Sequence, residues 1–487
     1  MHWTLALAAL VLGAWLYWWL AGVLITTTNQ DPLAQDQKNN MRAALLARPT
    51  LKMDLSQGMA PAVRKWLPHQ TDGVVAPLWP WVAAHIAPED LTIAEETFAQ
   101  NTPRELRFFQ QGKWLNVALA GVFLGALGLW AAGRWTLLGT ANFLLLAGLG
   151  ALLPRAAAFQ PEPLYYALFF LCWVVALRLC VRNALGWYVL FGLLCGLAAL
   201  AKSSIQPLMA VWFGAMAVRM VISWWRPNER WSAARHVIGL AMWGTAFLLV
   251  LAPRLSFAQE RWGRPFFEYP QVWAWMDDFT QGYAWMAQHP DKAALDAVPP
   301  GEMPSPLTYW NNHTPEQTWA RLREGVEEKV GGFLWPKPAG KNAGTPEKPW
   351  KRLLEYRGAF LGGLLLIALV AVLLKRLQRG RLVPLPPQEH TEWPETFCRA
   401  LFILGVLAAS ALLYGWYTPI GRGDRFMLSL WLPLVYSLFA WAEKSARPLP
   451  WGGARWGYAA AQAALLACLL WRVAEIVRQP HFQDKLP

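Results

Sequence analysis

Long apolar runs separated by short basic turns occupy most of the 487-residue chain. Residues 3–25 contain no charged side chain, and a run of about 20 apolar residues is long enough to cross the hydrocarbon core of a bilayer as a helix. Such runs predict about eleven spans, at residues 3–25, 113–133, 135–153, 162–181, 185–201, 204–224, 236–253, 357–375, 397–415, 426–442 and 455–474. We therefore expect an all-α polytopic membrane protein, and we interpret the first run as a retained span because it is long for a signal peptide.

Two long polar segments interrupt the apolar runs and suggest how the chain is divided. The expected parts are a first transmembrane helix (1–25), a loop (26–112), a transmembrane bundle (113–253), a second loop (254–356) and a C-terminal bundle (357–487). Both loops contain sequences with helical character, so we expect helices next to the membrane surface in each of them.

The turns between the runs divide into a basic set and a less basic set. The basic set contains Arg134, Arg178, Arg182, Arg226, Arg230, Arg235, Lys375, Arg376, Arg379, Arg381, Lys444, Arg447 and Arg455. Because Lys and Arg accumulate in cytoplasmic turns, this asymmetry places the N-terminus in the cytoplasm and both long loops on the opposite side. We expect a bacterial inner membrane with the loops facing the periplasm.

Three segments of the two loops have a recognisable pattern. Residues 33–47 have helical character, and residues 74–87 are apolar and aromatic, so this second segment is expected to lie in the membrane interface or dip into it. Residues 315–334 read as an amphipathic helix. Its expected buried face is formed by Trp319, Leu322, Val326 and Val330, and its exposed face by Arg323, Glu324, Glu327 and Glu328.

Composition agrees with a membrane protein and argues against a nucleic-acid-binding one. The chain is 55% hydrophobic and only 15% charged, and many of its 32 Trp residues flank apolar runs, as expected at membrane–water interfaces. The net charge of +13 comes from short clusters between the runs, and no basic stripe on a soluble domain is apparent. The five Cys fall in or beside the expected spans, so neither a disulfide framework nor a Cys-based metal site is expected.

Ionisable side chains gather where the expected spans meet the outer face. An ionisable group in or beside a span is energetically costly, so each one calls for a functional or structural reason. The group comprises Asp31 and Asp36 after the first span, Glu162 at the start of the fourth, Lys202 after the fifth, Arg254 after the seventh, and Arg422, Asp424 and Arg425 before the tenth.

The order of these elements resembles the GT-C membrane glycosyltransferases, in particular the bacterial branch related to protein O-mannosyltransferases and lipid A aminoarabinose transferases. The matching elements are, in order, DPLAQDQKNNMRAALLA after the first span, DGVVAPLWPWVAAH, Glu162 in QPEPL, Gly196 to Lys202, Pro253 with Gly263, Pro265 and Phe266, and Arg425 with Phe426 and Pro433. Each element is short, but together they cover nearly the whole chain. The chain departs from the family at Asp36-Gln37, where mannosyltransferases have Asp-Glu, and at Pro253-Arg254, where Pro-Trp is usual.

This resemblance implies transfer of a sugar from a polyprenyl-phosphate donor, usually by a single displacement that inverts the anomeric carbon. Such a reaction needs a carboxylate that deprotonates or orients the acceptor and cations that stabilise the departing phosphate. We expect Asp36 to be the base, with Asp31 as second choice, and Glu162 to assist. Lys202 and Arg425, supported by Arg422 or Arg254, are expected to hold the phosphate.

Other residues could contact substrate or have ordinary structural roles. Asp277 and Asp278 form an acidic pair among aromatic residues, and His85 follows the Pro-aromatic segment. All three are candidate substrate contacts. A structural alternative exists for each catalytic candidate as well: Asp36 could cap a helix, Glu162 could interact with a helix dipole, and Lys202 or Arg254 could anchor a span at the interface.

Several functions remain open from the sequence. The main alternative to the transferase is a flippase or transporter of a lipid-linked saccharide, and an inactive scaffold or a polymer ligase would fit the same pattern. The sugar, the oligomeric state and the acceptor (a lipid, a polysaccharide or a protein) are not specified. No cofactor is specified either: acidic residues near Asp36 are compatible with a divalent cation at the donor phosphate, but no set of metal ligands is complete.

Overall fold

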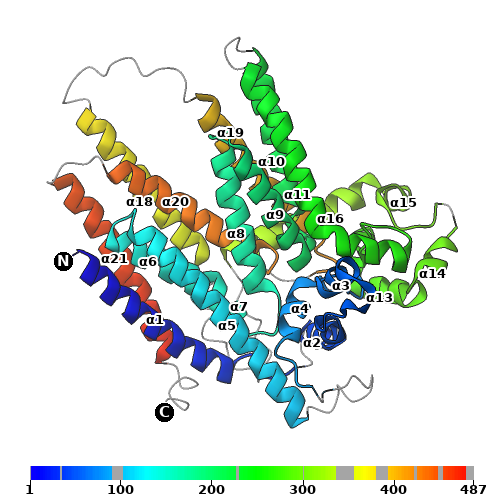
Figure 1. Ribbon diagram of the computed structural model, residues 1–487. Coiled ribbons are helices and arrows are strands. Elements are labelled where there is room, and N and C mark those ends of the chain that lie inside the picture. Colours follow the sequence, from blue (N-terminus) through cyan, green and yellow to red (C-terminus); the bar gives the residue numbers. More distant parts are fainter. Residues whose placement is uncertain are drawn as a thin grey trace.

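The computed structural model describes residues 2–32, 36–89, 91, 102–225, 230–299, 301–335, 356–379, 393–421, 425–447 and 453–478. Within these ranges every regular element is a helix (Figure 1). The long apolar helices and the turns within their bundle are α1 (His2–Thr27), α5 (Pro103–Ala132), α6 (Leu137–Ala147), η4 (Gly148–Leu152), α7 (Leu153–Ala156), α8 (Glu162–Leu179), α9 (Leu185–Ala201), η5 (Ser203–Ile205), α10 (Gln206–Trp225), α11 (Arg230–Trp262), α18 (Arg357–Arg379), α19 (Trp393–Trp416), η8 (Met427–Leu430), α20 (Trp431–Ala446) and α21 (Gly453–Val477).

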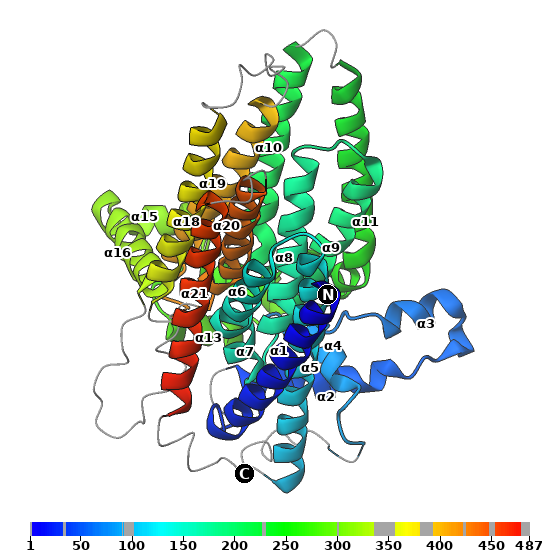
Figure 2. The same ribbon diagram turned by 90° about the vertical axis from the view of Figure 1, so that its left-hand side faces the viewer.

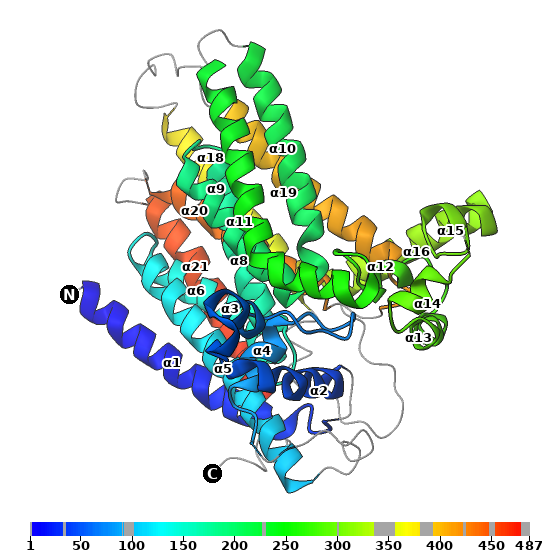
Figure 3. The ribbon, with the colours of Figure 1, turned by 45° about the vertical axis from the view of Figure 1, so that its right-hand side comes forward.

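The remaining helices belong to the two polar segments. They are α2 (Gln37–Ala47), η1 (Arg48–Leu51), η2 (Leu55–Gln57), α3 (Met59–Trp66), α4 (Leu78–Ala84), α12 (Tyr269–Trp273), α13 (Phe279–Gln288), α14 (Lys292–Asp296), α15 (Pro306–Asn312) and α16 (Pro315–Leu334). In Figure 3, α12 to α16 lie to one side of the long helices, and α2 to α4 lie beside α5. Figure 2 shows α3 projecting away from the long helices, on the side opposite to α15 and α16.

Eight helical segments in the described part of the chain are long and apolar enough to cross a membrane. They are Pro103–Ala132, Leu137–Ala156, Glu162–Leu179, Ser203–Trp225, Ala233–Trp262, Arg357–Lys375, Pro394–Trp416 and Arg455–Glu475. The prediction of an all-α, multi-pass membrane protein is confirmed at this level. The other three expected spans coincide with α1, α9 and η8–α20, so the count of eleven stays a prediction.

Small residues bring α9 and α11 into close contact. Gly192 and Gly196 are one turn apart on α9. A Cβ atom at Gly192 would lie 2.4 Å from the Trp243 carbonyl oxygen, and one at Gly196 would lie 2.7 Å from Val250 Cβ. Glycines four residues apart allow helix backbones to approach in a membrane, where packing rather than the hydrophobic effect holds helices together.

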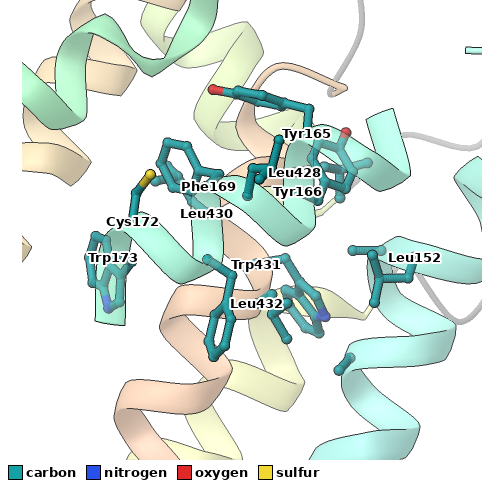
Figure 4. Close-up of a cluster of buried hydrophobic side chains, with 14 of the residues drawn as sticks. Leu152, Tyr165, Tyr166, Phe169, Cys172, Trp173, Leu428, Leu430, Trp431 and Leu432 are labelled. Carbon is teal, nitrogen blue, oxygen red and sulfur yellow. The ribbon is translucent and has the colours of Figure 1, made fainter. Parts of the chain in front are cut away.

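A cluster of large buried side chains joins α8 to η8 and α20 (Figure 4). The side chains of Tyr166 and Trp173 from α8 lie in this cluster with Trp431 from α20. The Trp431 indole donates a hydrogen bond to the Leu146 carbonyl at 2.8 Å, and the Tyr166 hydroxyl donates to the Arg425 carbonyl at 2.7 Å. The cluster therefore fixes the backbone at Arg425, just before η8, against the start of α8.

The first polar segment packs on the protein through aromatic residues. Helix α4 lies against α2, and Trp79 on α4 is fully buried beside Phe159 and Phe108. Residues 74–87 had been predicted to lie in or dip into the membrane interface. Most side chains of α4 are buried within the protein, and the position of this segment relative to the membrane interface stays a prediction.

Helix α16 forms as predicted, and Leu322, Val326 and Val330 of the predicted buried face are half-buried, but Trp319 is not. Trp319 is 64% exposed, whereas Thr318, Gly325 and Lys329 are buried. The prediction was wrong for Trp319, because the closest contact with α19 is made at a glycine: a Cβ atom at Gly325 would lie 1.9 Å from the Gly415 carbonyl oxygen. The four charged residues expected on the other face are exposed.

The basic turns and the polar segments lie toward opposite ends of the long helices. Figure 1 shows the end of α10 and the start of α11 toward the top, while α2 to α4 lie below. The turn after α5 meets the end of α20, where the Arg447 guanidinium donates to the Arg134 carbonyl. This separation matches the arrangement that the positive-inside pattern requires, and the side that faces the cytoplasm stays a prediction.

Candidate functional site

A cavity of about 240 Å³ lies where the polar segments meet the ends of the long helices. Its lining comes from the start of α2, residues 74–76, the start of α8, the junction of α9 and α10, the segment from Glu268 through α13, the end of α19, and Ile420, Gly421, Arg425 and Phe426. Side chains from seven separate parts of the sequence therefore converge on one space. Four of the predicted site residues line it: Asp36, Glu162, Lys202 and Arg425.

Asp36 pairs with Arg425 across the cavity. The Asp36 carboxylate contacts the Arg425 guanidinium, and the two side chains are 45% and 24% exposed. Asp36 occupies the residue before α2, where an aspartate often caps a helix, but its side chain makes no capping hydrogen bond. The capping alternative is thus not the role that the structure gives this carboxylate.

Glu162 and Lys202 form a second and more deeply buried pair. Lys202 Nζ lies 2.9 Å from Glu162 Oε1, and the side chains are 17% and 2% exposed. The backbone of Lys202 is extended between α9 and η5, so its side chain turns inward to Glu162 rather than outward to an interface. Burial lowers the pKa of Lys202, and the nearby Glu162 carboxylate opposes that shift.

Three cationic side chains lie near the Phe426 ring. Lys202 Nζ lies 4.9 Å, Arg425 Cζ 5.2 Å and Lys329 Nζ 5.7 Å from the ring centroid. Cations over an aromatic face are stabilised by the ring quadrupole. Lys329 comes from α16, is buried, and also donates to the Gly421 carbonyl. The sequence did not single it out, because its helix was recognised by its apolar residues.

Arg254 and Glu268 form a third acid–cation pair, of which only Arg254 was predicted as a site residue. Glu268 lines the cavity, and its Oε1 lies 3.8 Å from Arg254 Nη2. Arg254 itself does not line the cavity. It lies 5.5 Å from the Trp262 ring centroid and donates to the Phe267 carbonyl at 2.9 Å. Burial raises the pKa of Glu268. The available sequence signal was its position two residues after Phe266 in the Pro-Phe element, in GRPFFEYP.

Aromatic rings and uncharged polar groups complete the lining. Trp273 and Tyr283 stack with ring centroids 5.3 Å apart, and Phe279 lies 4.6 Å from Tyr283. The other polar lining residues are Asn39, Asn40, Ser203, Ser204, Gln206 and Gln271. Apolar and aromatic walls with a few placed polar groups are typical of sites for small molecules.

The other predicted site residues that the structure describes do not line the cavity. Asp31 is exposed. Asp277 Oδ1 lies 3.1 Å from His313 Nε2 and 3.8 Å from Arg321 Nη1. Asp278 accepts a hydrogen bond from the Gln281 amide and caps α13.

His85 and Arg422 are the last two predicted site residues. His85 is exposed and bonds to the Trp81 carbonyl at 2.9 Å, and Arg422 lies outside the described residues. Structural partners thus account for Asp277, Asp278 and His85. Across the described residues, no three His, Cys, Asp or Glu side chains form a group that could hold a metal ion.

No protein-family model matches the chain, and neither a curated protein nor a solved structure matches it significantly.

Proposed function

We propose that this protein is an integral membrane glycosyltransferase that moves a sugar from a polyprenyl-phosphate donor to an acceptor on the extracytoplasmic face. The observation that carries the proposal is the convergence of two acid–cation pairs, Asp36–Arg425 and Glu162–Lys202, on one cavity at the end of the long apolar helices. The resemblance of the sequence to GT-C enzymes, with about eleven spans, supports the same reaction. The expected location is a bacterial inner membrane with the site toward the periplasm.

Lys202 and Arg425 are suited to hold the donor phosphate. Both cations line the cavity and lie over the same Phe426 ring, so a phosphate beside that ring can reach both. Fixed cations in a water-poor site stabilise the negative charge that develops on the leaving phosphate. Each cation already faces a carboxylate, so the incoming phosphate would compete with Asp36 and Glu162 for them.

The size of the cavity favours a donor that carries a single sugar. An apolar cavity of about 150 Å³ accommodates a benzene molecule, and this cavity of about 240 Å³ is larger but below the range typical of drug-sized ligands. The wall of Trp273, Phe279 and Tyr283 offers ring faces to one side of such a sugar. The amides of Asn39 and Gln271 can bond to its hydroxyl groups.

The position of the cavity argues against the flippase alternative. Transporters commonly bind substrate near the middle of the membrane, between repeated halves of the bundle. Here the lining combines the ends of long helices with the outer segments that carry α2, α12 and α13. The acceptor can be a lipid, a polysaccharide or a protein.

Turnover in nanodiscs tests the proposal. Purified wild type is supplied with polyprenyl-phosphate monosaccharides and a membrane extract as the acceptor source, and release of free polyprenyl phosphate is followed by mass spectrometry. We expect Arg425→Gln to lower turnover by about 10- to 100-fold, because charged hydrogen bonds contribute about 1.5–3 kcal/mol. Arg64→Gln is the matched control, since Arg64 pairs with Glu260 on the surface. Wild type that transfers no sugar from any donor would refute the transferase.

A further inference from the structure

Among the described residues, the three carboxylates that line the cavity differ in how tightly a cation holds them. Asp36 contacts Arg425 directly, and Glu162 lies 2.9 Å from Lys202. Glu268 has its nearest cation at 3.8 Å, and that cation, Arg254, is itself occupied by the Phe267 carbonyl. A cation close to a carboxylate stabilises its charged form and makes it a weaker base. Glu268 is therefore the cavity carboxylate least weakened by a partner.

Buried neighbours hold the backbone at Glu268 in place, while its side chain lines the cavity. Its neighbours Phe267 and Tyr269 are buried, and the Tyr269 amide donates to the Gly73 carbonyl at 2.9 Å. Glu268 occupies the residue before α12, but its side chain makes no capping hydrogen bond. The Glu268 carboxylate thus lines the cavity with Arg254 at 3.8 Å and the Ser203 side chain as its partners.

The surroundings of Glu268 also favour proton transfer. Burial raises the pKa of its carboxyl group, and this shift is opposed by Arg254 and by a hydrogen bond with the Ser203 side chain. A general base works best when its pKa lies near the operating pH. Ser203 follows Lys202 directly, so Glu268 is adjacent to the segment that carries the proposed phosphate-binding lysine.

We infer that Glu268, rather than Asp36, accepts the proton of the acceptor, and that the acceptor is a hydroxyl group. This inference rests on the proposed function. As the acceptor oxygen bonds to the anomeric carbon, its proton passes to the Glu268 carboxylate. The bond from that carbon to the phosphate oxygen breaks, and its electron pair leaves on the polyprenyl phosphate beside Lys202 and Arg425. Asp36 then serves as a positioning residue that holds Arg425 in place.

The choice of base bears on the class of acceptor. A hydroxyl is a poor nucleophile until a base removes its proton, whereas a phosphate oxygen is already an anion at neutral pH and needs no base. A cavity with a loosely paired carboxylate is matched to the first kind of acceptor. The inference therefore favours alcohols of a saccharide, lipid or protein over phosphate groups.

The pH dependence of turnover identifies the base. Transfer is measured for wild type, Glu268→Gln and Asp36→Asn in nanodiscs, with the same donors and membrane extract. A base must be deprotonated to act, so wild-type kcat/KM falls as pH decreases through the pKa of the base. We expect Glu268→Gln to lower kcat about 100- to 10,000-fold and to abolish this acid limb, as is usual for the loss of a general base. Asp36→Asn is expected to raise KM for the donor and keep the acid limb.

Two further variants separate a base from a structural role. Formate should restore part of the turnover of Glu268→Ala, because a small carboxylate can occupy the space left in the cavity, whereas a structural defect would not respond. Glu268→Asp retains a carboxylate and should keep an acid limb. Glu260→Gln is the matched control, because Glu260 lies on α11 outside the cavity with an exposed side chain, and it should behave as wild type.

The outcomes distinguish this inference from the proposed function. If wild type transfers sugar but Glu268→Gln matches it, or if the acid limb disappears only in Asp36→Asn, Glu268 is not the base. If phosphate groups prove to be the glycosylated sites, the assignment of a hydroxyl acceptor is wrong. Wild type that is inactive with every donor removes the proposed function and this inference with it.

Discussion

Two acid–cation pairs that line the cavity join residues that are distant in the sequence. Asp36 and Arg425 are 389 residues apart, and Glu162 and Lys202 are 40 apart. The pairing neutralises the site when it is empty and keeps both cations beside the Phe426 ring. Buried ion pairs add little net stability, but removing one partner leaves an uncompensated charge that costs about 3–5 kcal/mol. Comparing a variant that lacks one member of a pair with a variant that lacks both therefore separates an effect on function from an effect on stability.

Lys202→Met should lower both stability and donor binding. It leaves Glu162 charged and almost fully buried, so we expect a loss of about 3–5 kcal/mol in unfolding free energy. The double variant Lys202→Met with Glu162→Gln removes the charge as well and should recover most of that loss. Thermal unfolding in detergent measures stability, and retention of a polyprenyl-phosphate sugar measures binding. Recovery of binding together with stability in the double variant would show that Lys202 does not hold the donor.

Sequence reasoning identified site residues where an ionisable group lies at the end of an expected span or close to it. Asp36, Glu162, Lys202 and Arg425 were found in this way, with support from the family resemblance, and the structure brings all four to one cavity. Glu268 was missed because it lies within a long loop, among aromatic residues and away from any expected span. Proximity across the chain depends on tertiary packing, which no local pattern contains.

At the scale of elements, the contact between α16 and α19 positions one wall of the site. Arg321 on α16 lies 4.5 Å from the Trp416 ring centroid and donates to the carbonyls of Trp416 and Ala274. Ala274 lines the cavity and directly follows α12. The fit of α16 against α19 therefore determines where the segment between α12 and α13 sits.

Gly325→Ala should disturb this contact, and Gly331→Ala should not. A Cβ atom at Gly325 would lie 1.9 Å from the Gly415 carbonyl oxygen, whereas nothing lies within 4 Å of one at Gly331. Overpacking of this kind costs about 1–3 kcal/mol, while an Ala in place of a helical Gly is stabilising by up to about 1 kcal/mol. Thermal unfolding of both variants checks this. Equal stability of the two would mean that α16 and α19 do not approach as closely as described.

The existence of α16 was predictable, and the exposure of Trp319 was not. Hydrophobic periodicity correctly gave a helix at 315–334, because charged residues recur on one side. The periodicity predicted that Trp319 is buried, but Trp319 is exposed. Close packing of the two helices instead requires a small residue at the contact, and Gly325 is that residue. A large apolar side chain such as Trp319 can remain exposed where a further surface, such as lipid, is available to it.

At the scale of the whole molecule, the separation of basic turns from the cavity predicts its orientation. Apolar runs gave the helices reliably because crossing a bilayer demands about 20 apolar residues in a row. The count of spans was harder to establish, since α9 and α20 are short for membrane-spanning helices. Charge asymmetry predicts sidedness without reference to the fold.

Accessibility of single cysteines tests this orientation. Ser56 in η2 and Ala184 before α9 are exposed and belong to opposite ends of the long helices by the predicted topology. In a background with Cys468→Ser, the other cysteines are buried. We expect a membrane-impermeant maleimide to label Ser56→Cys in intact spheroplasts and Ala184→Cys only after permeabilisation. The reverse pattern would place the cavity on the cytoplasmic side and contradict the topology.

The most direct test of the central claim is release of free polyprenyl phosphate by wild type and by the Lys202→Met, Glu162→Gln double variant in nanodiscs. The double variant removes a proposed phosphate-binding cation without leaving a buried charge unpaired. With a polyprenyl-phosphate monosaccharide and a membrane extract, wild type should release the carrier together with a glycosylated product, and the double variant should do so at least about tenfold more slowly. Equal release by the two proteins, or none by wild type with any donor, would contradict the assignment of this cavity as a lipid-phosphate-sugar transferase site.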